Sequence, residues 1–313
     1  MRSLKKLLGA ALLGALLLAL AAPALAAEEE FVLKGSALTG YNGPGGHVVI
    51  PDGVRRIGDF VFWGRTDITG VTFPEGLAWI GEEAFYECTG LTSLRIPGSV
   101  RTISERAFSG CTGVTEIVLE EGVEYLGEYA FGDCSGITEL TIPASMTTVR
   151  DGFVSCLALE RVTLSPGVKK IDKGAFWDCI SLWQVDIPDT VTQIGQAAFG
   201  NCVSLRGVDI PDSVTRIDSE AFAVWLLEGN QPAGTTGPAL RGGAGSQAER
   251  HAREWGLEFI QAAPGNELEL GPEPAPLEKS PPGRAAEPLP AGGLGLTERA
   301  AAGLALLIRM ALV

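Results

Sequence analysis

The chain has 313 residues and a formal net charge of −14, from 38 acidic and 24 basic residues. Nucleic acid is disfavoured as a partner, because binding to a phosphate backbone requires clustered Lys and Arg side chains. We interpret the acidity as a means of staying soluble outside the cell rather than as an acidic binding function.

The N-terminus has the parts of a secretory signal peptide. Three basic residues precede an apolar run over residues 7–20, and an A-L-A sequence at residues 24–26 provides a cleavage site. A first transmembrane helix is the alternative, but the run is short for a bilayer and acidic residues follow it. We therefore expect a signal peptide over residues 1–26. Its removal takes away three basic and no acidic residues, which makes the mature charge −17 and places the protein outside the cell or on its surface.

Residues 28–48 are expected to cover the N-terminal end of the fold, as the first repeat of a stacked structure needs a cap. The segment "FVLKGSALTGYNGPGGHVVIPDGV", residues 31–54, predicts a hairpin whose turn is "YNGPGG". His47 lies on this segment and is expected to be a surface residue rather than a ligand.

One pattern recurs eight times over residues 49–225, as in "IPDTVTQIGQAAFGNC" and "IPDSVTRIDSEAF". The stride is 23 residues, except for one of 22 in which "MTTVRDGF" has lost a residue. Alternating segments such as "LTSLRIP" predict one strand per stride, ended by Pro, and a shorter extended piece follows at V-x-x-I. One unit cannot bury its own apolar face, so stacked copies must share a core. This predicts a solenoid of eight short coils with a parallel β-sheet, about 40 Å long at ~4.8 Å per coil.

A column of phenylalanines is expected along the core of this stack, because every stride has one at the same offset. Each ring would contribute about 1.5–3 kcal/mol by burial. The column comprises Phe62, Phe85, Phe108, Phe131, Phe153, Phe176, Phe199 and Phe222.

These repeats resemble the bacterial surface leucine-rich repeats often called BspA-like, over residues 31 to about 225. The shared pattern is I-P-x-x-V-x-x-I-x-x-x-A-F-x-x-C-x-x-L-x-x-V-x-I-P. The sequence departs from it at Arg65, which stands at the Cys position, at Glu120, which replaces Pro, and at the short fifth unit with Gly152. The resemblance implies an α/β solenoid of the leucine-rich-repeat kind, with terminal caps, surface display, and adhesion or host-protein binding. The short unit is expected to kink the stack locally.

All six cysteines occupy one column of the repeat, which argues against disulfides. Parallel neighbours point the same way at ~4.8 Å, whereas bonded cysteines need converging Cβ atoms about 3.8 Å apart. A zinc ladder fails because no C-x-x-C pair occurs. We therefore expect buried free thiols that fill space against turn backbone. They are Cys88, Cys111, Cys134, Cys156, Cys179 and Cys202.

Residues 226–262 are expected to form a C-terminal cap. "LLEGNQPAGTTGPALRGG" reads as a turn-rich insertion, and "GSQAERHAREWGLEFI" as a short helix and a strand. Ser246 and Glu249 form a capping box, and Gly256 ends the helix. His251 is expected on the polar side of that helix.

The remaining residues divide into a Pro-rich linker over 263–295 and a C-terminal helical tail over 296–313. The tail could be an amphipathic helix, a remnant resembling the opening of an S-layer homology motif, or part of a sortase-like tail after "LPAGG". A spanning helix is disfavoured because the apolar part is short and contains Arg309. We expect a cell-wall or surface association element.

No catalytic motif is present, and two distant histidines leave little for acid–base or zinc chemistry. We expect no enzymatic activity, no cofactor and no catalytic metal. One carboxylate cluster could bridge calcium, or could be a solvated acidic edge, which we prefer. It comprises Asp186, Asp189, Asp209 and Asp212.

Four tryptophans, Trp63, Trp79, Trp177 and Trp183, are candidates for partner contacts or for packing against a neighbouring coil. Trp177 and Trp183 form the better pair because they share one coil. The leading hypothesis is a monomeric secreted or cell-surface module that binds a protein, matrix or glycan partner through its solenoid surface. A non-binding spacer or wall-associated scaffold is the alternative.

Overall fold

The computed structural model describes residues 30–228 and 231–263. The predicted signal peptide (1–26), the tail (296–313) and all but the first residue of the linker (263–295) lie outside the described residues. In the described part, no helix is both long and apolar enough to cross a membrane. The chain divides into two compact units, Met1–Val224 with Thr235–Pro274, and Trp225–Gly234 with Ala275–Val313.

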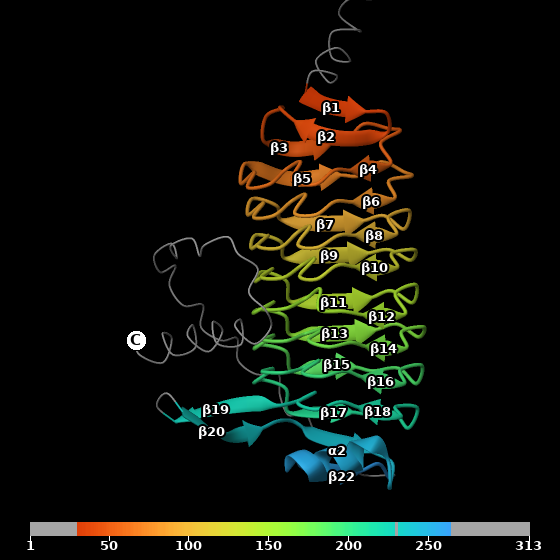
Figure 1. The fold of residues 1–313 in the computed structure, drawn as a ribbon, viewed down its shortest axis with the longest axis vertical. Coiled ribbons are helices and arrows are strands. Elements are labelled where there is room, and N and C mark those ends of the chain that lie inside the picture. Colours follow the sequence, from red (N-terminus) through yellow and green to blue (C-terminus); the bar gives the residue numbers. More distant parts are fainter. Residues whose placement is uncertain (1–29, 229–230, 264–313) are drawn as a thin grey trace, which may run out of the picture. The chain divides into compact units, whose positions relative to one another are not determined.

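The first unit is a parallel β-solenoid in which each coil contributes one longer and one shorter strand (Figure 1). We number the coils 1 to 8 by their phenylalanine, from Phe62 to Phe222. The longer strands are β3 (Gly46–Val49), β5 (Ile68–Thr72), β7 (Ser93–Ile96), β9 (Glu116–Leu119), β11 (Glu139–Ile142), β13 (Arg161–Leu164), β15 (Gln184–Asp186) and β17 (Gly207–Asp209). The shorter strands are β4 (Arg56–Ile57), β6 (Trp79–Ile80), β8 (Thr102–Ile103), β10 (Tyr125–Leu126), β12 (Thr148–Val149), β14 (Lys170–Ile171), β16 (Gln193–Ile194) and β18 (Arg216–Ile217). The predicted solenoid is confirmed, and the short pieces form a second set of parallel ladders.

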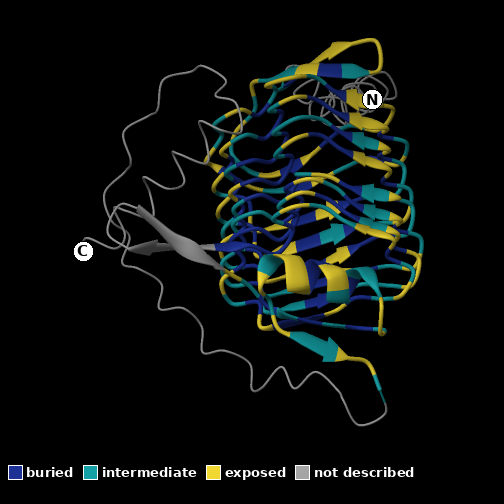
Figure 2. Ribbon diagram, turned by 60° about the horizontal axis from the view of Figure 1, so that its bottom comes forward, coloured by how far each residue is buried: buried dark blue, intermediate teal, exposed yellow. Residues whose placement is uncertain are grey.

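The core lies between the two sets of strands and is a single apolar column (Figure 2). Rings of the eight phenylalanines stack along it, with centroids of neighbouring coils 4.6 to 5.9 Å apart and interplanar angles of 2° to 12°. All eight are fully buried. The predicted phenylalanine column is therefore confirmed.

The turn before each phenylalanine contains a residue with left-handed backbone, except in coil 5. In coil 4 this residue is Tyr129, with φ 54°, and in coil 6 it is Gly174, with φ 63°. Coil 5 has one residue fewer, and Gly152 instead donates its N–H to the Arg150 carbonyl two residues back, at 2.7 Å. Here the short-strand ladder breaks, because β10 pairs with β8 and β12 with β14. The Phe131 and Phe153 rings stay stacked at 5.4 Å across this break. The local kink predicted for the short unit stays a prediction.

The six cysteines are free and buried, as predicted. Each Sγ lies close to the backbone carbonyl of the phenylalanine in the preceding coil, as in Cys134 to Phe108 at 3.2 Å and Cys88 to Phe62 at 3.0 Å. The thiol is therefore a weak donor that satisfies a buried turn carbonyl. Cysteine recurs at this position because its small side chain fits the stack and its S–H meets one turn carbonyl in each coil.

The N-terminal cap is a hairpin, but its predicted turn is wrong. β1 (Phe31–Lys34) and β2 (Ala37–Tyr41) pair antiparallel around Gly35–Ser36, and β2 then pairs parallel with β4. Gly35 has φ 64°, which suits a two-residue turn. The "YNGPGG" segment instead connects β2 to β3, and the Tyr41 hydroxyl donates to the Pro44 carbonyl at 2.9 Å.

Arg65, which replaces cysteine in coil 1, holds this loop in place. Its guanidinium donates to the Gly43 carbonyl at 3.0 Å and to both oxygens of Asp67, at 2.8 and 2.9 Å. It also lies 5.3 Å from the centre of the Tyr41 ring. The first coil has no preceding phenylalanine carbonyl to satisfy, so a longer side chain there serves the cap.

The C-terminal cap differs from the prediction in two respects. The segment read as a turn-rich insertion contains β21 (Ala239–Gly242), which pairs with β17 and continues the stack by a further turn. β22 (Phe259–Gln261) pairs with β21. In addition, β19 (Val224–Glu228) and β20 (Gln231–Thr236), most of whose residues belong to the second unit, form a two-stranded sheet.

The helix α2 (Gln247–Trp255) closes the open end of the core. Ser246 accepts the N–H of Glu249 at 3.3 Å, and Gly256 ends the helix with φ 68°, as predicted. The prediction for His251 is wrong, because its side chain is buried and its ring lies 6.0 Å from that of Phe222. The imidazole meets the last phenylalanine edge-on, at an interplanar angle of 73°, and so covers the end of the aromatic column. Burial lowers its pKa to about 4.

Candidate interaction surface

The side of the solenoid formed by the short strands presents a varied set of outward side chains. We call the outward residues of these strands and the residues directly flanking them the short-strand face. In-register pairing places one outward residue of each coil beside that of the next, except at the break between β10 and β12. From coil 1 to coil 8 this column reads Arg56, Trp79, Thr102, Tyr125, Thr148, Lys170, Gln193 and Arg216.

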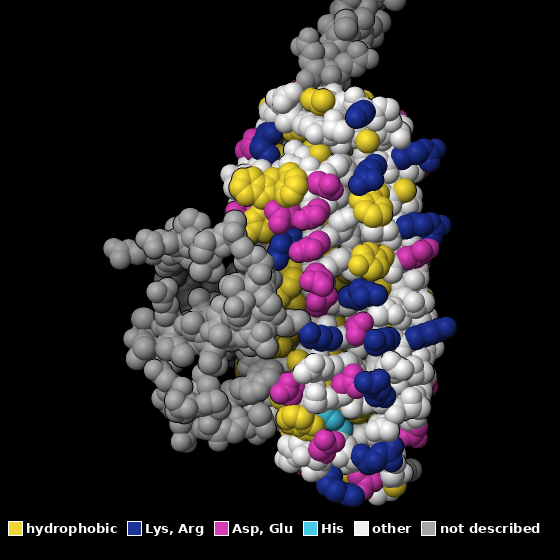
Figure 3. Space-filling model, in the orientation of Figure 1, with side chains coloured by type: hydrophobic (Ala, Val, Ile, Leu, Met, Phe, Trp, Pro, Cys, Tyr) yellow, Lys and Arg dark blue, Asp and Glu magenta, His cyan; other side chains and the backbone are white. Residues whose placement is uncertain are grey.

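Two aromatic side chains of this column are exposed, Trp79 by 37% and Tyr125 by 44%. They lie on strands separated by one strand, β8, so about 10 Å separates them along the solenoid. The Arg56 guanidinium lies 5.0 Å from the Trp79 ring centre, and that of Arg150 5.3 Å from the Tyr125 ring centre. Figure 3 shows these hydrophobic side chains over β6 and β10, with Lys and Arg side chains above and below them.

Several cations of the short-strand face form no close ion pair, although Arg150 lies near enough to Asp172 to help lower the pKa of that carboxyl. Three are paired: Arg101 with Glu124, Lys170 with Asp172 at 3.0 Å, and Arg216 with Asp218 at 2.5 Å. Within residues 30–228 and 231–263, no ion pair engages the other four, which are Arg55, Arg56, Lys169 and Arg150. This positive potential stands out on an acidic chain.

An acidic column borders this face on the side of the phenylalanine turns. It consists of the second residue after each short strand in coils 1 to 5, and Figure 3 shows acidic side chains beside the basic ones. Its members are Asp59, Glu82, Glu105, Glu128 and Asp151. The face therefore has a basic half, next to the Pro turns, and an acidic margin.

A second exposed aromatic group lies in the turns of coils 1 and 2. Phe60 and Trp63 are each 53% exposed, and the Trp63 ring stacks on that of Tyr86 at 6.2 Å and 7°. Neither Phe60 nor Trp63 contributes to the fully buried core.

The long-strand face has its charges mostly paired. Arg95 pairs with Glu120 at 2.6 Å, Arg161 with Glu139, and Arg241 with Asp209 at 2.6 Å. Such exposed pairs contribute little to stability, but they leave less net potential for a charged partner than the short-strand face does.

The predicted pair Trp177 and Trp183 is only partly exposed. Trp177 follows Phe176 in the turn, and Trp183 directly precedes β15, so they lie on different parts of one coil. Trp183 lies 5.9 Å from the Arg161 guanidinium, and its indole Nε1 is buried with no hydrogen-bond partner among the described residues. A binding role for Trp177 and Trp183 stays a prediction.

The four aspartates proposed as a calcium site are exposed, and three already have protein partners. Asp209 accepts from Arg241, Asp212 accepts the Gly243 N–H at 3.2 Å, and Asp186 accepts from Gln184 at 3.1 Å. In the part of the chain that the structure describes, no group of three His, Cys, Asp or Glu side chains is arranged to hold a metal ion. The geometry favours the solvated acidic edge over calcium binding.

The buried cysteines and Asp178 lie in surroundings that disfavour their charged forms. Burial raises the pKa of Cys88 to about 12, and the other thiol pKa values are raised as well, so none is a ready nucleophile. Burial also raises the pKa of Asp178, against the effect of hydrogen bonds from the Asn201 amide and the Ser155 hydroxyl. His47 is exposed, as predicted, and its Nε2 lies 2.8 Å from the Thr72 hydroxyl.

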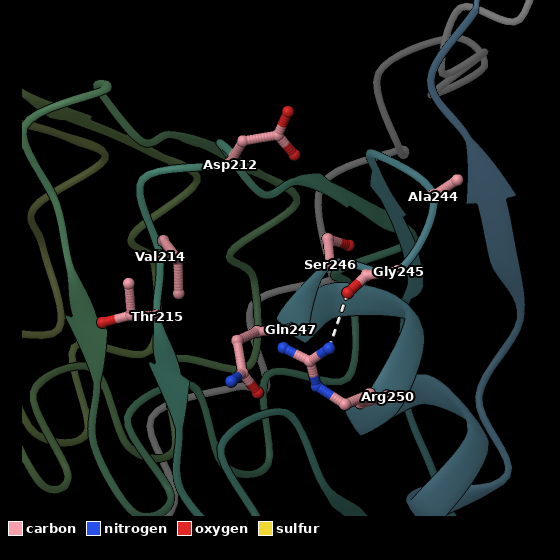
Figure 4. A pocket seen from close by; sticks show the side chains of 8 residues that line it. All are labelled: Asp212, Val214, Thr215, Ala244, Gly245, Ser246, Gln247 and Arg250. Carbon is pink, nitrogen blue, oxygen red and sulfur yellow. Dashed lines mark hydrogen bonds between the residues drawn. The ribbon is translucent and has the colours of Figure 1, made fainter.

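A hollow of about 480 Å³ lies between the last coil and the start of α2 (Figure 4). Its lining includes Asp212, Thr215 and Gln247. Arg250 also lines it, but its guanidinium donates to the Gly245 carbonyl at 2.6 Å rather than pointing freely into the space. The hollow is open, and Ser246, Arg250 and Thr215 already use polar groups in hydrogen bonds within the protein.

The sequence named Trp79 and Trp63 as candidates but missed Tyr125, Phe60, Arg56 and Arg150. The informative position is the residue directly before the second apolar residue of V-x-x-I in each repeat. Trp79 and Tyr125 occupy this position two coils apart.

Comparison with known proteins agrees with the repeat and the fold. The model of the BspA type leucine rich repeat region matches residues 42–153 and 149–228, in six copies. The solved structure of a T. pallidum leucine-rich repeat protein is 26% identical, covers 57% of this chain and 89% of its own, and has a TM-score of 0.53. A leucine-rich repeat protein of Bacteroides ovatus is 23% identical over 72% of this chain and 62% of its own, with a TM-score of 0.45. No curated protein matches the sequence.

Proposed function

Because this chain belongs to the BspA-type leucine-rich repeat family, we propose that it is a binding module of the cell exterior. In this proposal it is exported by the signal peptide predicted at residues 1–26. Displayed or secreted, it engages a protein, matrix or glycan partner in adhesion. Recognition takes place on the outside of the solenoid, by surface complementarity rather than by chemistry.

The observation that carries this proposal is the exposure of large aromatic side chains that the fold does not need. Phe60, Trp63, Trp79 and Tyr125 are 37% to 53% exposed, although the buried phenylalanine column already fills the core. Aromatic residues at the surface are enriched where partners bind, because they bury a large area at low entropic cost. All four lie in coils 1 to 4, which makes the N-terminal half of the solenoid the preferred side for a partner.

The thiol chemistry supports a protein that works in an oxidising compartment. Its six cysteines are buried, and their raised pKa values leave almost no thiolate at neutral pH. Oxidation requires accessible thiolate, so the folded chain resists both disulfide formation and oxidation.

The test is binding of the chain without residues 1–26 to a panel of immobilised extracellular matrix proteins and glycans. We expect at least one panel member to retain the protein, and the combined variant Phe60→Ser, Trp63→Ser, Trp79→Ser and Tyr125→Ser to lose it. A matched control replaces Leu157 and Val203, which are 37% and 52% exposed, by Ser. Retention by no panel member, or equal retention of both variants, would refute the proposal.

The alternative is a spacer that holds another element away from the cell wall. The continuous stack of coils, followed in the sequence by the predicted Pro-rich linker, favours this second candidate. A spacer should bind no panel member, whereas removal of residues 263–313 should release it from the cell surface.

A further inference from the structure

We propose that the basic half of the short-strand face binds an extended, negatively charged polysaccharide lying along the solenoid axis. This inference rests on the proposed function and gives it a site and a ligand class. The contacts would come from Trp79 and Tyr125, from the unpaired cations Arg56, Arg150 and Lys169, and from the hydroxyls of threonines between them.

The spacing of the aromatic rings matches a polymer rather than a compact ligand. Trp79 on β6 and Tyr125 on β10 are two coils apart, about 10 Å by strand spacing. In an extended, β-linked polysaccharide, alternate sugars face the same way, and its two-sugar repeat is close to two strand spacings. Both rings could therefore receive the apolar faces of alternate sugars in one chain, since an aromatic ring presents an apolar body to its ligand.

The residues between and beside the rings are suited to sugars. Thr102 lies between Trp79 and Tyr125 in register, and Thr148 follows in coil 5. Thr147 and Thr192 lie on the coils before and after that of Lys169. The Lys169 N–H donates to the Thr147 carbonyl, and the Thr192 N–H donates to the Lys169 carbonyl. A hydroxyl can donate and accept at once, so such a column can pair with sugar hydroxyls without strict orientation.

The charge of the ligand follows from the unpaired cations. Arg56 and Arg150 stand next to the two rings, and Lys169 lies in the next coil. Arginine can bind a carboxylate through two parallel hydrogen bonds. Arg56 has no ion pair within the described residues, and Arg150 has no close one, although Asp151 and Asp172 lie near enough to interact with it electrostatically. Both guanidinium groups therefore keep donors for a ligand carboxylate, so a uronate-type polysaccharide fits better than a neutral glycan.

The acidic margin limits where the polymer can lie. Glu82, Glu105 and Glu128 would repel carboxylates that approach the turn side of coils 2 to 4. The polymer is therefore confined to the column of outward strand residues and the side near the Pro turns, with Arg150, which directly precedes Asp151, at the border of the acidic margin. An acidic peptide would present carboxylates without the apolar sugar faces that the two rings can receive.

The test measures affinity of the chain without residues 1–26 for three soluble polymers. Alginate rich in mannuronate is the acidic polysaccharide, hydroxyethyl cellulose is the neutral one, and polyglutamate is a polyanion without sugars. We expect alginate to bind at least tenfold more tightly than either of the others, and its affinity to fall with salt.

Variants assign the contacts. Trp79→Ala with Tyr125→Ala should weaken alginate binding at least tenfold, and Trp79→Phe with Tyr125→Phe should largely preserve it. Arg56→Gln, Arg150→Gln and Lys169→Gln together should also weaken it tenfold and flatten its salt dependence. Arg95→Gln with Arg161→Gln on the long-strand face removes two cations and should change affinity less than twofold. Urea midpoints of all variants check that the solenoid stays folded.

Three outcomes would overturn the inference: no binding of alginate, equal binding of polyglutamate, or loss of affinity in the long-strand variant as large as in the short-strand one. If alginate fails while the wild-type chain still binds a matrix protein through its exposed aromatics, the proposed function stands and only this ligand is rejected. If both fail, the proposed function is rejected with it.

Discussion

The column of buried thiols predicts that the fold loses stability at mildly alkaline pH. The pKa of every cysteine is raised in the folded chain, mainly by burial in five of them and, for Cys156, first by its hydrogen bond with Cys179. In the unfolded chain the thiols ionise near pH 8.5. Between the two pKa values the unfolded state binds fewer protons, so the free energy of unfolding falls as pH rises. The stabilisation is fully present below about pH 8.5 and is lost progressively above it.

The magnitude follows from the number of thiols. From pH 7.5 to pH 9.5, each thiol that stays protonated in the folded chain lowers the free energy of unfolding by about 1 kcal/mol. Because the pKa is raised in all six cysteines, their contributions add to a loss of several kcal/mol, a large part of the stability of a typical domain. We therefore expect the solenoid to be markedly less stable at pH 9.5 than at neutral pH.

The assay is urea unfolding followed by circular dichroism at several pH values between 7.5 and 9.5. Cys134→Ala should reduce the pH-dependent loss by about 1 kcal/mol, the contribution of one thiol. Val114→Ala also truncates a fully buried side chain of the core. It should destabilise the fold at every pH without changing the pH dependence. A free energy of unfolding that stays constant up to pH 9.5, or thiols that react with a disulfide reagent before unfolding, would refute the reasoning.

Three further predictions concern the core, the cap and one turn. Phe108→Ala should lower the free energy of unfolding in urea by about 3–5 kcal/mol, because its ring is fully buried between those of Phe85 and Phe131 at 4.9 and 5.2 Å. Phe60→Ala, at an exposed position, should lower it by less than about 0.5 kcal/mol. Because the pKa of His251 is about 4 in the folded chain, the unfolded state takes up a proton first as the pH falls, and the protein should lose about 2 kcal/mol of unfolding free energy by pH 5. His251→Phe should abolish this acid sensitivity. An unchanged pH profile in the variant would contradict the explanation. Gly122→Ala should destabilise the fold by more than about 2 kcal/mol, because φ is 116° and a Cβ would lie 2.0 Å from the Gly98 carbonyl oxygen. Gly35→Ala, with open space around the added Cβ, should cost only about 1 kcal/mol. Equal urea midpoints for the two variants would argue against the steric explanation.

The sequence by itself determined the repeated part of this protein. A residue at a fixed offset in every 23-residue stride faces the same environment in each coil, so its burial can be inferred from periodicity alone. The phenylalanine column and the free thiols were predictable for this reason, because stacking by translation fixes both the direction and the spacing of neighbouring side chains. The position of the missing residue in coil 5 could also be read from the sequence, but the break that the short-strand ladder shows there could not.

Only the tertiary structure decided what happens where the repetition ends and where coils touch laterally. The hairpin turn at Gly35–Ser36, the burial of His251 and the extra strand β21 each depend on which surface closes an open end of the stack, and no periodic signal encodes that choice. Whether the guanidinium groups beside Trp79 and Tyr125 form ion pairs depends on which side chain of the adjacent coil lies within reach of each of them. Periodicity constrains inward side chains because all of them meet the same core, whereas outward side chains and caps are fixed by individual contacts between residues far apart in the chain.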